Sequence, residues 1–388
     1  MIDILVRYSE LGLKSRPVRR YMEQLLRRNI IRNLTKLGIA DSQISCKKPQ
    51  GRLIFSLALE KPQLTEELVN SILFVFSHLV AGISSISLIK KTSSHFSDIK
   101  SLALEQAATN LSPGSSFAVR ARRVGSHSYT SRDVERELGA EILDLLQEKL
   151  AISVDLENPD YTLFIEIRDN RAYIFDQKIS GIGGLPQGTQ GKIFSVLRGS
   201  LADVIAGFLI CKRGTFTTPV VFSLAQSDIY KNNIDAIDEH LAFFEKFQPK
   251  KKHYYYQVDF LPIIETVGLE QLTCSICDEI CLEIINRIRD EEEIAGVSLG
   301  NAEKTLLYRI PKSSMIKDDS FIPIYYPLIA IAPDDIKHPC HNLSHRFCLE
   351  SCPGYTNQKK EGIKPLPNET IQEIVAKADY RLITSRLS

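Results

Sequence analysis

The apolar and polar positions of the first ninety residues alternate between strand and helix periods. The run IDILVRY at 2–8 predicts a buried strand, and the apolar stripe from Val18 to Leu34 predicts a helix after it. Two short strand patterns then flank the turn KKPQGR, and an apolar helix near 65–81 leads to a strand near 84–90. This order, βαββαβ, predicts a ferredoxin-like unit.

A second unit follows the connector KKTSSH. A helix near 97–110 precedes the strand SFAVRARRV at 116–124, and a polar turn leads to a helix that begins near Ser131. The strand patterns YTLFIEI and RAYIF flank an Arg-Asp-Asn turn and predict a hairpin. The glycine-rich segment SGIGGLPQGTQGK at 180–192 then indicates a link into a third region.

Apolar strands alternate with helices in the third region, which is typical of a doubly wound α/β domain. The strand patterns lie near residues 217–223, 253–259, 295–299 and 323–325. We therefore expect an α/β protein with an α+β front half. The expected domains are a ferredoxin-like domain at 1–92, a second domain at 93–182 and an α/β domain at 183–388.

Composition places the chain among ordinary globular proteins, since 44% of its 388 residues are hydrophobic and 24% are charged. Asp3 and Arg7 interrupt the apolar start, so we expect no secretory signal. The uncharged run from Ser71 to Ile89 contains five serines, a histidine and a glycine, so we expect no membrane span. The sequence therefore predicts a cytoplasmic protein without a membrane partner.

Basic residues gather at the front of the chain. The net charge is +1, but the first fifty residues carry 11 Lys and Arg against 4 Asp and Glu. Such a surface suits a polyanion such as RNA, although a solvated helix and sheet face would explain the same charges. The candidate RNA-binding residues are Arg16, Arg19 and Arg20 on the first helix, Arg120, Arg122 and Arg123 on the strand at 116–124, and Arg132 on the next helix.

Several of these segments resemble one family. FAVRARRVGSHSYTSRDVERELGAEILDLL and VDLENPDYTLFIEIRDNRAYIF resemble the THUMP domain, an RNA-binding module of tRNA-modifying enzymes. The opening ILVRYSELGLKSRPVRRYMEQLLRRNI and the link GIGGLPQGTQGK are similar to the ferredoxin-like domain and the domain junction of the 4-thiouridine tRNA sulfurtransferases, the ThiI family. The resemblance implies a THUMP domain at 93–182, a PP-loop-like ATP-pyrophosphatase domain at 183–388, tRNA as the partner and a homodimer.

The same resemblance makes the strand-to-helix turn RGSLAD the place of a phosphate loop. Family members are expected to adenylate uridine with ATP at a loop of the form Ser-Gly-Gly-x-Asp-Ser, whose glycines let the backbone approach pyrophosphate. Here Gly199 keeps the first glycine, Arg198, Ser200 and Ala202 replace Ser, Gly and Asp, and Asp203 replaces the last Ser. We expect a degenerate nucleotide-binding loop that has lost ordinary ATP and magnesium chemistry, with Asp203 as the candidate for a remaining catalytic role.

Six of the eight cysteines form two clusters, which indicates metal or redox chemistry in an intracellular chain. The first cluster, LTCSICDEIC, lies at a predicted helix N-terminus, where the helix dipole favours a thiolate, and the second is HPCHNLSHRFCLESCP. The clustered cysteines are Cys274, Cys277, Cys281, Cys340, Cys348 and Cys352.

Archaeal members of the family are similar in pairing a C-x-x-C with a later cysteine to hold an iron–sulfur cluster. That resemblance implies Cys274 and Cys277 as ligands together with Cys348 or Cys352, and it leaves Cys281 and Cys340 as further candidates. Zinc suits the same thiolates and stays open as the alternative metal.

The resemblance implies a tRNA-binding protein of tRNA sulfur modification, in the 4-thiouridine pathway, with an iron–sulfur cluster and an altered ATP loop. Two alternatives remain open because the loop is altered while the cysteines are intact. One is a non-enzymatic tRNA-binding paralogue or subunit that presents tRNA to another modification enzyme. The other is an ATP-independent cluster enzyme that removes sulfur from tRNA. We find no segment similar to a rhodanese domain, so sulfur is expected from a cluster or from a sulfur-donor protein.

Overall fold

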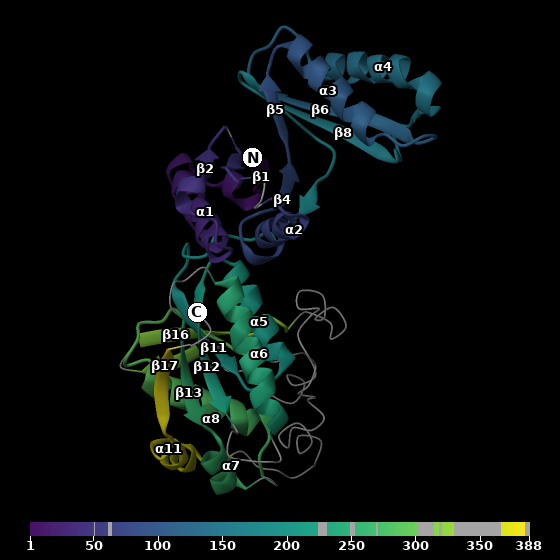
Figure 1. The fold of residues 1–388 in the computed structure, drawn as a ribbon. Coiled ribbons are helices and arrows are strands. Elements are labelled where there is room, and N and C mark those ends of the chain that lie inside the picture. Colours follow the sequence, from purple (N-terminus) through teal and green to yellow (C-terminus); the bar gives the residue numbers. More distant parts are fainter. Residues whose placement is uncertain are drawn as a thin grey trace. The chain divides into compact units, whose positions relative to one another are not determined.

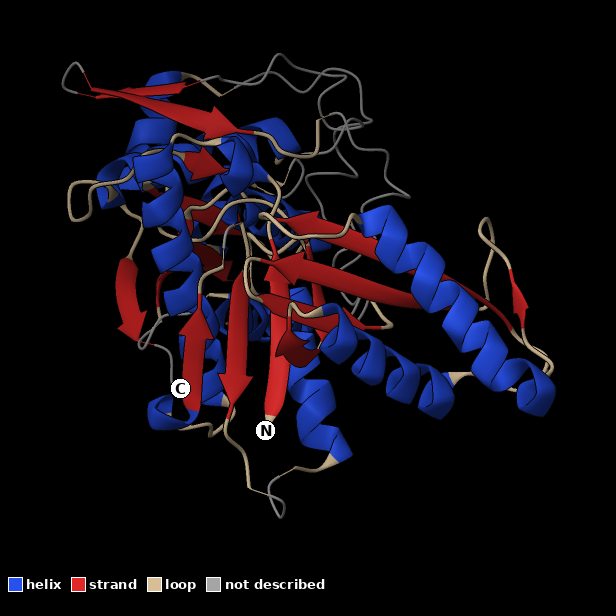
Figure 2. Ribbon diagram, turned by 90° about the horizontal axis from the view of Figure 1, so that it is seen from above, coloured by secondary structure: helices blue, strands red, loops and turns tan. Residues whose placement is uncertain are grey.

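The computed structural model of the chain describes residues 1–49, 51–60, 64–223, 231–248, 253–268, 271–300, 314–317, 320–329 and 366–384. It divides into two compact units, Met1–Gly183 and Gly184–Ser388 (Figure 1). Helices alternate with strands along both units. Figure 2 shows the helices in blue and the strands in red. Within the described ranges, no helix is both long and apolar enough to cross a membrane.

The first sheet of the first unit is ferredoxin-like, as the sequence predicts. Its strands lie in the order β10-β4-β1-β3-β2, and all neighbours are antiparallel. On α1, Leu26, Ile30 and Leu34 are fully buried because spacings of four residues place them on one helix face. The elements are β1 (Ile2–Arg7), α1 (Arg16–Lys36), β2 (Ile44–Lys47), β3 (Leu53–Leu57), α2 (Glu66–Phe74) with a π-helical turn at Val75–Leu79, β4 (Ser85–Leu88) and β10 (Ile179–Ser180).

The second sheet of this unit has the order β5-β9-β8-β6-β7. Two helices, α3 and α4, lie side by side on one of its faces (Figure 1). Leu163, Ile165 and Ile167 of β8 are buried in the core beneath these helices, so the alternate residues of the strand face the other way. The elements are β5 (Lys90–Ser93), α3 (Phe96–Asn110), β6 (Ser116–Val124), α4 (Ser131–Leu150), β7 (Ser153–Val154), β8 (Tyr161–Arg168) and β9 (Arg171–Phe175).

Two segments that the sequence predicts to be connectors contain short strands. The segment KKTSSH, expected to be a linker, contributes β5, which pairs antiparallel with β9. The glycine-rich link contributes β10, which returns to the first sheet and pairs with β4. Neither segment has an apolar period, because its pairing depends on backbone hydrogen bonds to an existing sheet edge.

The second unit has the predicted α/β architecture. Its described strands form one sheet in the order β15-β16-β14-β11-β12-β13-β17, with parallel pairing from β16 to β13 and antiparallel strands at both edges. The elements are β11 (Lys192–Leu197), α5 (Leu201–Lys212), β12 (Phe216–Ser223), α6 (Lys231–Phe247), β13 (Tyr254–Asp259), α7 (Leu261–Val267), α8 (Cys274–Ile288), β14 (Val297–Ser298), β15 (Ser314–Lys317), β16 (Ser320–Tyr325), α11 (Asn368–Ala376) and β17 (Tyr380–Thr384).

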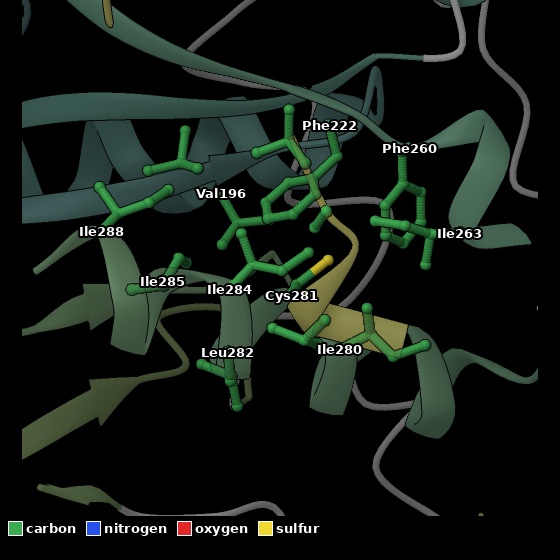
Figure 3. Packing of buried hydrophobic residues seen from close by; sticks show 14 of the residues in the cluster. Val196, Phe222, Phe260, Ile263, Ile280, Cys281, Leu282, Ile284, Ile285 and Ile288 are labelled. Atoms are coloured by element: carbon green, nitrogen blue, oxygen red, sulfur yellow. The ribbon is translucent and has the colours of Figure 1, made fainter. Parts of the chain in front are cut away.

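Helices cover both faces of this sheet. Phe194 and Val196 of β11 belong to a core cluster that includes residues of α7, α8 and α11, some of which Figure 3 shows. Ser195 points to the opposite face, where a Cβ added at Gly207 of α5 would lie 2.5 Å from its hydroxyl and from Phe244 of α6. Alternation along one strand therefore places α5 and α6 on one face and α7, α8 and α11 on the other.

Candidate functional site

A buried carboxylate lies where the two sheets of the first unit meet. Glu166 of β8 accepts hydrogen bonds from Arg7 in β1 at 2.8 Å, from Arg52 just before β3 at 3.1 Å and from Arg168 in β8 at 3.0 Å. The four side chains are between 4% and 12% exposed. Burial opposes ionisation of Glu166, but the charges of Arg52 and Arg7 outweigh it and lower the pKa of Glu166 to about 2.

Beside this carboxylate, the sheet face away from α3 and α4 forms a basic pocket of about 190 Å³. Arg120 and Arg122 of β6 lie opposite Phe164 and Glu166 in the parallel register, so these side chains share one face. Five cationic side chains line the pocket, against the carboxylate of Glu166: Arg7, Arg52, Arg120, Arg122 and Lys178.

The pocket holds more positive charge than its own groups neutralise. Nη2 of Arg7 is buried and has no hydrogen-bond partner within the described part of the chain. Nζ of Lys178 lies 3.7 Å from the ring centroid of Phe164, and the guanidinium of Arg7 lies 4.6 Å from that of Phe175. Burial, reinforced by the charge of Arg7, lowers the pKa of Lys178. An anion in the pocket would accept a hydrogen bond from Nη2 of Arg7. Its negative charge would also offset the positive charge that lowers the pKa of Lys178.

The structure separates the predicted RNA-binding residues into groups. Arg120 and Arg122 line the pocket, but Arg123 lies on the helix-covered side and donates to the carbonyl of Gly125 at 3.1 Å. The others are surface residues of α1 and α4 outside the pocket lining, with Arg19 half-buried: Arg16, Arg19, Arg20 and Arg132.

Sequence reasoning missed five residues of this site, and one of them, Arg168, lies in the Arg-Asp-Asn turn predicted between two strands. Arg7 and Glu166 lie within apolar strands. A charged residue inside a hydrophobic run indicates a buried ion pair or a functional site, and this was the signal that could have identified them. Arg52 and Lys178 lie in connecting segments, where a basic residue is ordinary, so no local pattern distinguished them.

The altered loop between β11 and α5 is occupied by its own side chains. Oδ2 of Asp203 accepts the backbone N–H of Arg198 at 3.0 Å, and Oδ1 accepts the backbone N–H of Gly300 at 3.2 Å and a guanidinium N–H of Arg198 at 2.9 Å. Ser200 caps α5 through its hydroxyl, which accepts from the backbone of Ala202 at 3.2 Å. Two backbone N–H groups beside the first turn of α5, those of Arg198 and Gly300, thus donate to a carboxylate of the chain itself and not to a bound phosphate.

Space and charge in this loop also oppose a phosphate. A Cβ added at Gly300 would lie 2.3 Å from the backbone nitrogen of Asp203, so the chain after β14 packs directly on the first turn of α5. Arg198 also donates to Asp278 of α8 at 2.6 Å, which leaves one guanidinium between two carboxylates. The group therefore carries a net negative charge before any phosphate arrives.

The first cysteine cluster lies at the start of α8, as predicted. Thr273 caps this helix, and Cys274 and Cys277 are partly buried at its first turn. A hydrogen bond from Cys281 lowers the pKa of Cys277, burial opposes that shift, and Arg198 reinforces it. Cys281 is fully buried and points into the hydrophobic core (Figure 3), and burial raises its pKa well above the ordinary value.

The described residues supply part of a metal site. Cys274 and Cys277 provide thiols of the kind that iron–sulfur clusters and zinc require, and the protonated thiol of Cys281 is a poorer donor. No group of three or more His, Cys, Asp or Glu side chains with metal-binding geometry occurs in the described ranges. Cys340, Cys348 and Cys352 lie outside those ranges, so the remaining expected ligands stay a prediction.

His240 of α6 is a buried titratable group near the loop. It is completely buried, and neither ring nitrogen has a hydrogen-bond partner among the residues that the structure describes. Burial lowers the pKa of His240 to about 4, against the opposing charge of Asp203. The imidazole is therefore neutral at physiological pH.

A ferredoxin-like domain joined to a THUMP domain defines the class of this protein. Residues 3–87 match the family model of the ThiI ferredoxin-like domain, and residues 93–176 match that of the THUMP domain. The chain is 31% identical to a probable tRNA sulfurtransferase of Methanocaldococcus jannaschii, over 96% of this chain and 97% of that protein. It is 27% identical to the tRNA sulfurtransferase of Shewanella frigidimarina, over 90% of this chain and 70% of that protein. The chain belongs to the tRNA sulfurtransferase family.

Two solved structures share this fold. The fold is similar to that of PH1313 from Pyrococcus horikoshii, with a TM-score of 0.61 and 26% identity over 88% of this chain and 99% of that chain. A 4-thiouridine synthetase, solved in complex with RNA and bound ATP, matches with a TM-score of 0.70 over 99% of this chain and 100% of that chain. Identity to the synthetase is 22%, so that likeness concerns the fold.

Acid should destabilise the protein through His240. Because the pKa of His240 falls from 6.5 to about 4 on folding, below pH 6.5 the unfolded chain binds a proton that the folded chain does not. Stability is thus fully present above pH 6.5 and falls towards pH 4. His240→Phe should flatten this part of the profile, measured by urea unfolding with circular dichroism, whereas His95→Gln, at an exposed histidine, should leave it unchanged. If the dependence of stability on pH is the same in His240→Phe as in the wild type, the lowered pKa of His240 does not cause the loss of stability in acid.

Proposed function

We propose that this protein binds tRNA and acts in tRNA sulfur modification, in the 4-thiouridine pathway, without ordinary ATP-dependent adenylation. Membership of the family supports the pathway, and the relatives named above are tRNA sulfurtransferases. The single observation that carries tRNA binding is the basic pocket, in which five cations face one carboxylate. A phosphate group fits its volume of about 190 Å³ and supplies the missing negative charge.

The pocket is suited to the RNA backbone rather than to a base sequence. Arginine and lysine side chains that converge on one point bind phosphate oxygens, and such contacts position a nucleic acid without reading its sequence. The exposed arginines of α1 and Arg132 of α4 would extend the contact along the backbone. Binding should therefore weaken strongly as salt rises.

The loop between β11 and α5 supports a role without adenylation. Asp203 takes the backbone donors that would bind pyrophosphate, and the neighbouring carboxylate of Asp278 adds repulsion. This favours two functions beside a thiolation role: a tRNA-binding subunit that presents tRNA to another enzyme, and an ATP-independent cluster enzyme that removes sulfur from tRNA. A sulfur-donor protein and a homodimer belong to the proposal by family resemblance.

The cysteines are the second part of the proposal. Cys274 and Cys277, with Cys348 or Cys352, would hold an iron–sulfur cluster, or zinc in its place. A cluster with an open iron supplies a place to carry sulfide. The chain's own contribution is the start of α8, where the helix N-terminus and Arg198 favour the anionic form of Cys277.

Neutralising the pocket should weaken tRNA binding. The double variant Arg122→Gln with Lys178→Gln should bind unmodified tRNA about tenfold or more weakly, and the slope of log affinity against log salt should fall by about two, since two phosphate contacts are lost. Fluorescence anisotropy over a salt series measures both. Arg123→Gln removes a cation from the same strand on the other face and should have the smaller effect; an equal loss in Arg123→Gln would place the RNA elsewhere.

Ordinary adenylation should be absent. In an ATP–pyrophosphate exchange assay with unmodified tRNA, the wild-type protein should show no exchange, because the backbone N–H groups of Arg198 and Gly300 already donate to Asp203. Exchange that disappears in Asp203→Asn but persists in Asp41→Asn, a change at an exposed aspartate of the first unit, would refute this part of the proposal.

Metal content separates a cluster protein from a binding module. Protein purified without oxygen should contain iron and sulfide with a visible absorption band, and both should be lost in Cys274→Ser and Cys277→Ser. Cys211→Ser is the matched control, because Cys211 is buried on α5 and hydrogen-bonded to Thr217. Zinc without iron would select the alternative metal, and a colourless, metal-free protein that still supports modification would exclude the cluster.

A further inference from the structure

We infer that Glu166 is a positioning residue that holds the ferredoxin-like and THUMP domains together so that cations from both act on one stretch of RNA. We name the group Glu166, Arg7, Arg52 and Arg168 the Glu166 clasp. The RNA part of this inference rests on the proposed function. The clasp itself does not, because its geometry belongs to the free protein.

The clasp joins the two domains through one side chain. Glu166 and Arg168 belong to the THUMP domain, whereas Arg7 and Arg52 belong to the ferredoxin-like domain. Each carboxylate oxygen of Glu166 is bound across the interface, Oε1 by Arg7 at 2.8 Å and Oε2 by Arg52 at 3.1 Å. The carboxylate therefore fixes both the distance and the orientation of two guanidiniums that line the pocket.

Other contacts also cross this interface: the guanidinium of Arg7 lies 4.6 Å from the ring centroid of Phe175, and two further contacts constrain the guanidiniums less. Lys91 of β5, in the second sheet, pairs with Asp3 of β1, in the first sheet, at 2.6 Å, but Lys91 is 34% exposed. A small apolar cluster of five buried side chains packs beside the clasp: Leu5, Ile54, Ile89, Tyr173 and Phe175. Partly exposed ion pairs contribute little, and apolar contact is non-directional, so neither contact sets the positions of the guanidiniums as the buried carboxylate does.

Removing the carboxylate has two consequences of opposite sign for RNA binding. Loss of a negative charge next to a phosphate site should strengthen binding, if charge alone matters. Loss of the clasp leaves three buried guanidiniums that repel one another, which should separate the domains and weaken binding. The sign of the change in affinity therefore tells an electrostatic role from a positioning role.

The experiment compares the full-length wild type with Glu166→Gln, using unmodified tRNA over a salt series and small-angle X-ray scattering without RNA. We expect Glu166→Gln to bind about tenfold more weakly with a smaller salt slope, because fewer phosphates are contacted together, and to show a larger radius of gyration. Affinity that is unchanged or tighter, or an unchanged radius of gyration, would overturn the inference.

Two further variants keep the result interpretable. Glu166→Asp preserves the charge but shortens the side chain, so it should also weaken binding and loosen the domains; if Glu166→Gln does not fold, wild-type behaviour of Glu166→Asp would overturn the inference. Asp3→Asn removes one interface ion pair and one negative charge and should bind tRNA as well as the wild type or better; a loss equal to that of Glu166→Gln would also overturn it.

The experiment distinguishes a wrong inference about the Glu166 clasp from a wrong proposed function. If the wild type does not bind tRNA, the proposed function fails, and the scattering comparison still tests the clasp. If the wild type binds tRNA and Glu166→Gln matches it in affinity and in radius of gyration, the clasp fails and the proposed function stands.

Discussion

A carboxylate buried among arginines is the interaction on which the first unit depends. Glu166 is ionised although it is buried, because Arg7, Arg52 and Arg168 surround it. Three guanidiniums on one carboxylate also leave a surplus of positive charge, and Lys178 with two arginines of β6 adds to it. The same group of side chains thus holds the two sheets together and leaves a surplus of positive charge that a bound anion can neutralise.

The second unit also has a group of paired arginine and carboxylate side chains, but there the carboxylates outnumber the guanidinium. Arg198 lies between Asp203 and Asp278, so the surplus at the start of α5 is negative. A strand-to-helix turn of this kind can bind a phosphate when its backbone N–H groups are free. Here a carboxylate from within the chain meets the backbone donors, and the chain at Gly300 fills the space. The two units therefore differ in what they attract, which is why we assign the polyanion to the first unit.

Arg198 connects the loop between β11 and α5 to the helix α8. By binding Asp278 on α8, it links the end of β11 to the helix that carries Cys274 and Cys277. The same guanidinium stabilises the thiolate of Cys277. The loop between β11 and α5 and the helix that carries the first cysteine cluster thus form one structural arrangement, joined by Arg198.

The sequence by itself determined several helices and the longer strands of both units, the helix start at Cys274 and the residue pattern RGSLAD of the loop, because hydrophobic period and glycine positions act between neighbours in the chain. It did not predict β5, β7, β10, β15 or β17. The pairing of β5 and β10 depends on distant sheet edges. It grouped Arg123 with Arg120 and Arg122, although alternation along β6 places Arg123 on the other face. Only the tertiary structure decided that Glu166 meets Arg7 and Arg52, more than a hundred residues away, and that Asp203 closes its own loop. Packing decides which charged residues remote in sequence become partners. Electrostatic attraction depends on distance in space and on burial, and neither quantity can be inferred from the neighbouring residues in the sequence.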